Sequence, residues 1–227
     1  MAYNKKVEGT RFTIVYDGSN KYFRTEAFMI AEYLEEHYSE VDKFFGLEDI
    51  DYHTTIKIFS SLDDYAQFKN WYMGDMMSPT EIAYAACGNI YMMTKSAVAE
   101  RRKGTGEKID YEYMGEIALH ELTHVAHHVF DFVNNTGEKH STRLWFREGL
   151  ATYLGNKSQE KELDVSKIPY NILTNDLAMI SYGYYYSMIK YMIDHYTHEE
   201  VLEIMKDLDK IDEVGLVIYN ALAKRDL

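Results

Sequence analysis

The sequence predicts an α+β fold, with strands and helices mixed in its first half and helices alone in its second. Apolar and polar residues alternate in segments 11–17 and 54–60, as they do in half-buried β-strands. From about residue 111 onward, apolar residues recur at steps of three or four, which is the spacing of helices that bury one side. Strands early and helices late are typical of the α+β class.

The first 109 residues are expected to form an α/β lobe around a mixed sheet. Between the two strands, apolar residues at helical spacing predict a helix over about 21–45, and Gly46 is a suitable stop. Ser61, followed three residues later by Asp64, resembles a capping box and predicts a helix through about residue 70.

Segment 82–95 contains two strand-like runs interrupted by Gly88 and Asn89. This pattern predicts a hairpin or a bulged strand at the edge of the sheet. We expect residues 90–93 to form that edge strand.

Residues 110–227 are expected to form a helical lobe. Its helices are predicted at about 111–132, 142–155, 180–195, 198–208 and 211–223. Thr197 and Glu200 have the spacing of a capping box at the start of one of them.

Composition excludes several classes of protein. The 227 residues include 37 acidic and 24 basic residues, and a net charge of −13 repels phosphate backbones, so we expect no nucleic-acid partner. The single cysteine, Cys87, cannot form an internal disulfide and is expected to be buried.

No apolar run reaches the roughly 18–20 residues of a membrane span. We therefore expect a soluble protein, either the mature part of an exported bacterial protein or, if the sequence is complete as given, a cytoplasmic one. The oligomeric state is not predictable from these features.

The segment ALHELTHVAHH contains the pattern H-E-x-x-H at His120, Glu121 and His124. Residues four apart on a helix differ by about 40° around its axis and about 6 Å along it, so both imidazoles can reach one metal ion. A catalytic zinc site usually has three protein ligands, so a third ligand is expected elsewhere.

The third ligand is not expected on the same helix. His127 lies about 10 Å along the axis from His120, too far to share an ion with both other histidines, and we assign packing or support roles to His127 and His128. The metzincin pattern is excluded because Phe130 stands where its third histidine belongs. Glu148 lies in the apolar segment WFREGLATY, which is predicted to form a second helix. That helix could bring the carboxylate of Glu148 to the same ion as the two histidines.

H-E-x-x-H followed by a helix with E-G-x-A resembles the gluzincin metallopeptidases, the thermolysin-like zinc peptidases, and in particular the small bacterial peptidases of the MA-like family. The segments RFTIVYD, GNIYM and SYGYYYSMIKYM extend the likeness over most of the chain. The resemblance implies a zincin-type helix between the two lobes. It also implies one catalytic Zn²⁺ held by His120, His124 and Glu148, with Glu121 as general base.

The same resemblance implies a tyrosine that stabilises the oxyanion. Tyr182, which opens the late helix, is the expected residue, and Tyr185 and Tyr186 are alternatives. Thr152 departs from the family pattern, because it stands where thermolysin-like enzymes have an aspartate that orients a zinc-bound histidine.

The substrate implied is a peptide or protein. Gluzincins pair the substrate backbone with an edge strand, which residues 89–91 resemble, and the segment CGNIYM lacks the glutamate with which the aminopeptidases of this clan bind a free amine. An endopeptidase is therefore expected. The alternative is a zinc-bearing binding or toxin-like domain of gluzincin fold without general peptidase activity.

Overall fold

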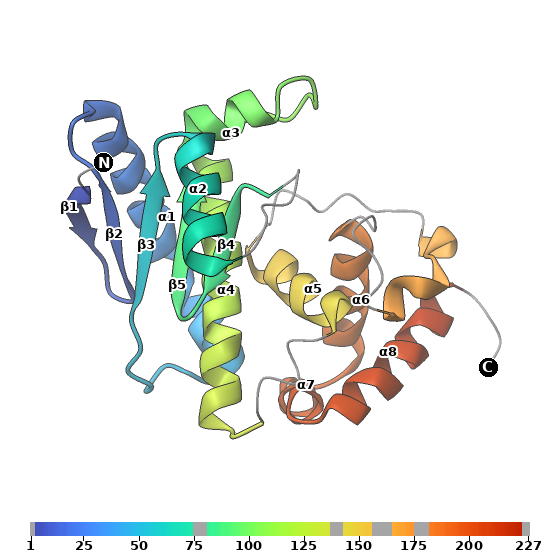
Figure 1. The fold of residues 1–227 in the computed structure, drawn as a ribbon. Coiled ribbons are helices and arrows are strands. Elements are labelled where there is room, and N and C mark those ends of the chain that lie inside the picture. The colour runs from blue at the N-terminus through green and yellow to red at the C-terminus, as the bar shows by residue number, and fades with distance from the viewer. Residues whose placement is uncertain (1–2, 75–80, 137–142, 156–164, 175–181, 224–227) are drawn as a thin grey trace. The chain divides into compact units, whose positions relative to one another are not determined.

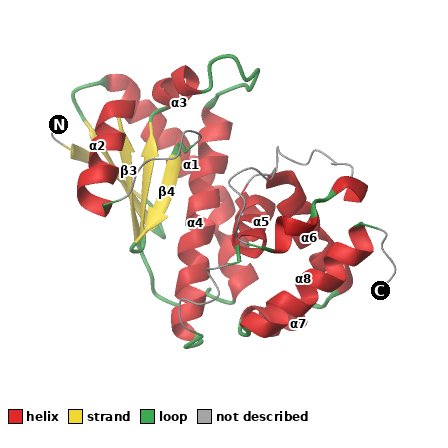
Figure 2. Ribbon diagram, turned by 45° about the vertical axis from the view of Figure 1, so that its right-hand side comes forward, coloured by secondary structure: helices red, strands yellow, loops and turns green. Residues whose placement is uncertain are grey.

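The computed structural model describes residues 3–74, 81–136, 143–155, 165–174 and 182–223, and it confirms the α+β class (Figure 1, Figure 2). The described chain forms two compact units. The N-terminal unit comprises residues 1–40 and 49–125, and the C-terminal unit comprises residues 41–48 and 126–227. None of the described helices has both the length and the apolar composition that a membrane span requires.

The N-terminal unit contains a mixed five-stranded sheet. In spatial order its strands are β1 (Tyr3–Glu8), β2 (Phe12–Asp17), β3 (Thr54–Phe59), β5 (Asn89–Met93) and β4 (Ala83–Ala86). The three central strands are parallel to one another, and the two outer strands are antiparallel to their neighbours. The predicted alternation holds, because Phe12, Ile14 and Tyr16 are buried while the residues between them are partly exposed.

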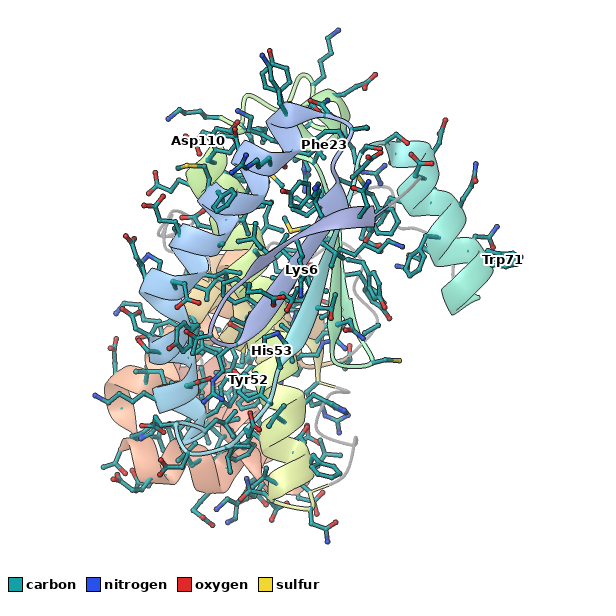
Figure 3. The ribbon with its side chains drawn as sticks, turned by 90° about the vertical axis from the view of Figure 1, so that its left-hand side faces the viewer. Lys6, Phe23, Tyr52, His53, Trp71 and Asp110 are labelled. Carbon is teal, nitrogen blue, oxygen red and sulfur yellow. The ribbon has the colours of Figure 1, made fainter. Side chains whose placement is uncertain are left out.

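Helices cover both faces of this sheet. On one side lie α1 (Lys21–Phe45) and the first part of α4 (Tyr111–Val133), and on the other lies α2 (Leu62–Met73) (Figure 2). Phe59 of β3 and Tyr91 of β5 both contact the ring of Phe68 on α2, at 5.1 and 4.6 Å between centroids. Trp71, near the end of α2, points away from the sheet (Figure 3).

The prediction of an edge strand at residues 90–93 is wrong. β5 lies between β3 and β4, and β4 is the edge strand. The turn between them consists of Cys87 and Gly88, both in the left-handed conformation at φ 51° and 73°, which a two-residue hairpin with a type I′ turn requires. Cys87 is consequently exposed at the turn and not buried as expected. Alternation along a sequence assigns residues to faces, but it does not give the order of strands in a sheet.

The sequence patterns also missed β1 and the short helix α3 (Lys95–Arg101). The start of α3 is stabilised from two directions. Thr94 caps it by accepting the backbone N–H of Ala97, and the buried Glu26 of α1 accepts the backbone N–H of Lys95 at 2.5 Å. The second contact joins residues 69 positions apart, so no local pattern reveals it.

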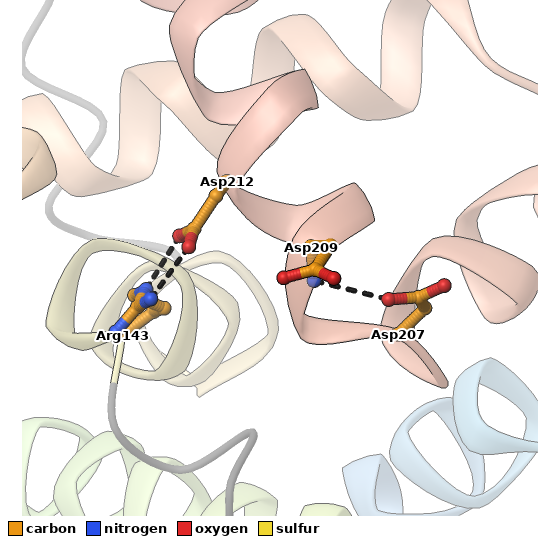
Figure 4. Close-up of polar contacts among 4 residues, drawn as sticks. All are labelled: Arg143, Asp207, Asp209 and Asp212. Atoms are coloured by element: carbon orange, nitrogen blue, oxygen red, sulfur yellow. Dashed lines mark hydrogen bonds and ion pairs between the residues drawn. The ribbon is translucent and has the colours of Figure 1, made fainter.

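The C-terminal unit is helical. Its elements are α5 (Leu144–Gly155), two short 3₁₀ turns (Val165–Lys167 and Tyr170–Leu173), α6 (Tyr182–His195), α7 (His198–Met205) and α8 (Leu208–Leu222). The capping box of Thr197 and Glu200 is confirmed. The last helix begins at Leu208 and not at 211, because Asp207 caps it by accepting the backbone N–H of Asp209 (Figure 4).

Trp145 forms the centre of this unit and is almost fully buried. Gly215 of α8 lies directly against it, and a Cβ at that position would lie 2.8 Å from the indole ring. Arg143, just before α5, donates two parallel hydrogen bonds of 2.5 Å to Asp212 of α8 (Figure 4). A bidentate ion pair of this kind restricts the relative orientation of α5 and α8 beyond what the apolar contact does.

Candidate metal centre

The H-E-x-x-H pattern lies on α4. Residues at the start of this helix and along it explain where it begins and which of its sides is buried. Asp110 precedes it and accepts the backbone N–H of Tyr113 at 3.0 Å, as an N-cap does (Figure 3). A hydrogen bond from the Lys108 ammonium, followed by this backbone bond, lowers the pKa of Asp110. An apolar stripe along the helix is buried: Met114, Ala118, Leu119, Leu122, Val125 and Ala126. Burial of that stripe orients the neighbouring polar side chains.

His120 and His124 lie one turn apart on α4, as predicted. Their ring centroids are 4.9 Å apart and the rings are nearly perpendicular, at 86°. Two imidazoles in this arrangement can direct one nitrogen each toward a common point. Both side chains are partly exposed, so an ion can reach them.

Glu148 of α5 joins the two histidines. One ligand atom from each of His120, His124 and Glu148 lies within 4.8 Å of the others, so these three side chains could hold a metal ion. Three ligands at about 2.0–2.2 Å from a tetrahedral zinc lie roughly 3.3–3.6 Å apart. Two imidazoles and one carboxylate form a donor set that suits zinc and other borderline metals.

The glycine that follows Glu148 allows α5 and α6 to pack closely. A Cβ on Gly149 would lie 2.8 Å from the backbone oxygen of Tyr185 and 2.6 Å from the side chain of Ile189. Only glycine lets α6 approach α5 this closely without displacing backbone. The Gly of the E-G-x-A pattern therefore has a packing role in this chain.

Arg147 is a neighbour of the site that the sequence interpretation missed. Its guanidinium donates to Oε1 of Glu148 from Nε at 3.0 Å and from Nη2 at 2.8 Å. The side chain of Glu148 is only 12% exposed, so this pairing offsets the cost of burying its charge. The adjacency of Arg and Glu in WFREG was the available signal.

The three tyrosines considered for oxyanion stabilisation have different surroundings. Tyr182 begins α6, is 48% exposed and contacts the ring of Tyr185 edge-on at 6.1 Å. Tyr185 is buried, and burial followed by the negative charge of Glu148 raises its pKa. Tyr186 is buried against the ring of Tyr153 at 5.7 Å.

Glu121 lies between the two histidines in sequence and is largely buried. Its charge acts on Tyr65 of α2, whose pKa is well above its usual value. The main cause is burial, followed by the charge and hydrogen bond of Glu81, with Glu121 a smaller contribution. No sequence pattern connected Tyr65 or Glu81 to this helix.

The remaining residues of interest have structural contacts. His127 is buried between the rings of Phe45, at 5.6 Å, and Phe146, at 6.0 Å, which agrees with the predicted packing role. Thr152 donates its hydroxyl proton to the backbone oxygen of Glu148 one turn earlier, at 2.7 Å. Thr152 therefore supports α5 itself.

No known protein family, curated protein or solved structure matches this chain significantly.

Proposed function

We propose that this protein is a zinc-dependent peptidase of the gluzincin type, and that it acts as an endopeptidase. The observation that carries the proposal is the convergence of His120, His124 and Glu148 from two helices, with Glu121 next to His120 in the sequence. Three protein ligands leave one position for water or substrate, as in catalytic zinc sites and unlike closed structural ones.

Each residue of the cluster has a role in this proposal. His120, His124 and Glu148 would hold a zinc ion, which would supply a water molecule of lowered pKa, about 7, and a Lewis acid for the carbonyl group. A carboxylate oxygen of Glu121 accepts the proton of the attacking water and later donates it to the leaving amine. A tyrosine hydroxyl donates a hydrogen bond to the developing oxyanion. Tyr182 is the residue predicted for this role, and Tyr185 is the competing choice because its environment includes Glu148.

Two features of the N-terminal unit favour an endopeptidase: the composition of the segment CGNIYM and the position of β4 at the edge of the sheet. The segment CGNIYM contains no glutamate that could bind a free amine, so nothing there selects a chain terminus. β4 is an edge strand, and an extended peptide can pair with its backbone. In this proposal β4 replaces residues 89–91 as the strand that binds substrate.

The test is cleavage of a diverse peptide library by zinc-loaded protein, with products identified by mass spectrometry. We expect cleavage within chains by the wild type, and a loss of at least about a thousandfold in Glu121→Gln with unchanged zinc content. Glu112→Gln, at an exposed position of the same helix, is the matched control and should cleave normally. Bound zinc without any cleavage by the wild type would instead favour a binding or toxin-like domain. Equal cleavage by wild type and Glu121→Gln would refute Glu121 as the base.

Tyr182→Phe and Tyr185→Phe distinguish the two tyrosines. Loss of an oxyanion donor lowers kcat by about 100-fold while KM changes little. We expect this kinetic signature in one of the two variants and near-normal kcat in the other. Near-normal kcat in both would remove tyrosine from the proposed mechanism.

A further inference from the structure

The first four turns of α1 carry an exposed stripe with an ordered change in chemistry. Its residues are Lys21, Thr25, Phe28, Met29, Glu32 and Glu36, all exposed. At 100° per residue they fall within a band about 100° wide and about 22 Å long. The stripe is basic at its start, apolar in its middle and acidic at its end.

The apolar part of this stripe is unusually open to solvent. Tyr22 is 66% exposed, Phe28 is 49% exposed and Met29 is 38% exposed. Together with Lys21, Arg24 and Thr25 they line a shallow depression of about 640 Å³. Figure 3 shows α1 along the flank of the N-terminal unit, with side chains directed outward from the side opposite the sheet.

Lys21 of the stripe and the neighbouring Arg24 both lie over aromatic rings. The guanidinium of Arg24 lies 5.5 Å from the ring centre of Phe28, and the ammonium of Lys21 lies 5.2 Å from that of Tyr22. These contacts keep positive charge beside the apolar depression. At the other end of the helix, Glu35 is already engaged by the backbone and hydroxyl of Thr10, whereas Glu32 and Glu36 lie on the exposed stripe.

We propose that this stripe is the interface of a twofold homodimer in which α1 packs antiparallel against α1 of a second copy. With the twofold axis between Phe28 and Met29, residue n lies opposite residue 57 − n. Lys21 then faces Glu36 of the other copy, and Thr25 faces Glu32, on both sides of the axis. Phe28 faces Met29 of the other copy on both sides of the axis, so the same residues of both copies form the centre of an isologous interface.

Charge selects a second copy over other occupants. The chain carries a net charge of −13, so copies repel one another unless the contact surface has opposite local charges. An acidic peptide would match the basic half of the stripe and be repelled by its acidic half. A partner that matches both halves must present the reverse order of basic, apolar and acidic residues, and antiparallel α1 has that order. A single helix pair lies at the low end of interface sizes, so we expect a dissociation constant on the order of 10–100 µM.

Sedimentation velocity over a wide range of protein concentrations tests the proposal. The wild type should pass from monomer to dimer. Lys21→Glu and Glu36→Lys should each weaken association by about tenfold or more, because each places like charges opposite one another. The double variant carrying both changes should restore dimerisation. The control Lys103→Glu makes the same charge change at an exposed site outside α1 and should dimerise nearly as the wild type does.

Cross-linking gives a second, independent readout. In a Cys87→Ser background, Met29→Cys places two thiols next to the twofold axis, where a disulfide can form. Lys43→Cys places the thiol about 22 Å along the helix from the axis and should remain uncross-linked. A monomer at all concentrations, failure of the double variant to recover, or equal cross-linking at residues 29 and 43 would overturn the proposal. None of these readouts depends on peptidase activity.

Discussion

The histidine ligands and the carboxylate ligand of the candidate metal centre are positioned by different means. His120 and His124 lie one turn apart on α4, so the helix itself brings their rings to 4.9 Å. Glu148 lies on another helix, α5, which packs closely against α6 at Gly149. One part of the site is therefore local, and the other depends on tertiary packing.

This difference predicts two classes of variant. Changes on α4 remove a ligand and leave the rest of the chain intact. Changes around α5 alter the position or the charge of Glu148 and affect folding and metal binding together.

The largest effect is expected for His124→Ala. Removing one of three ligands should lower zinc affinity by at least about 100-fold, because two ligands hold the ion far less tightly. His128→Ala, at an exposed position one turn further along the same helix, should bind zinc as the wild type does. Competition with a chromogenic chelator measures both. Unchanged affinity in His124→Ala would break the assignment of the local half of the site.

Glu26 extends the comparison to another carboxylate that tertiary packing places. Burial raises its pKa to about 7, and the bond from the Lys95 backbone only partly offsets this. Because the folded-state value is higher than the unfolded one, the group stabilises the fold below about pH 4.5, and this stability is lost as pH rises to about 7. We expect Glu26→Gln to unfold with a free energy up to about 3 kcal/mol higher than the wild type at pH 8, and with an almost equal one at pH 4.

Denaturant titrations at several pH values test this expectation. Glu100→Gln, at an exposed position on α3, is the control and should follow the wild type throughout. A difference between Glu26→Gln and the wild type that does not change with pH would contradict the expected coupling.

Gly149→Ala should have an intermediate effect on the tertiary half of the site. The added Cβ meets the Tyr185 backbone oxygen, so we expect a loss of about 2 kcal/mol in the free energy of unfolding and weaker zinc binding. Gly215→Ala is the matched comparison, because its Cβ would meet the Trp145 side chain instead. It should lower stability with a smaller change in zinc affinity. Equal changes in zinc affinity would show that Gly149 has no particular part in placing Glu148.

The smallest effect is expected for Arg147→Gln. Arg147 donates two hydrogen bonds to Oε1 of Glu148 and adds positive charge beside the ion. Removal of Arg147 should therefore strengthen zinc binding by a few-fold, equivalent to less than about 1 kcal/mol. Lys190→Gln, which removes an exposed cation on α6, should leave the affinity unchanged. Weaker zinc binding in Arg147→Gln would mean that the guanidinium chiefly orients the carboxylate.

Sequence patterns were most informative where a structure is maintained by nearby residues. The helix over 21–45 and the strand at 54–59 were predicted almost to the residue, Ser61 caps its helix, and the capping box at Thr197 is present. Periodicity and capping depend on residues within one or two turns, so the sequence contains them directly.

Errors arose where distant segments decide the structure. The edge strand was assigned to residues 90–93, but pairing with the short run Ala83–Ala86 places β5 inside the sheet. The helix α3 went unpredicted, and part of its stabilisation comes from Glu26, far away in sequence.

The sequence by itself determined the α+β class and the helix that presents two histidines and a glutamate at ligand spacing, because helical geometry relates residues three and four apart. Only the tertiary structure decided that Glu148 joins them and that Tyr185 lies within the electrostatic reach of Glu148. The physical reason is that both relations join side chains of different helices, and no local pattern encodes how two helices approach each other.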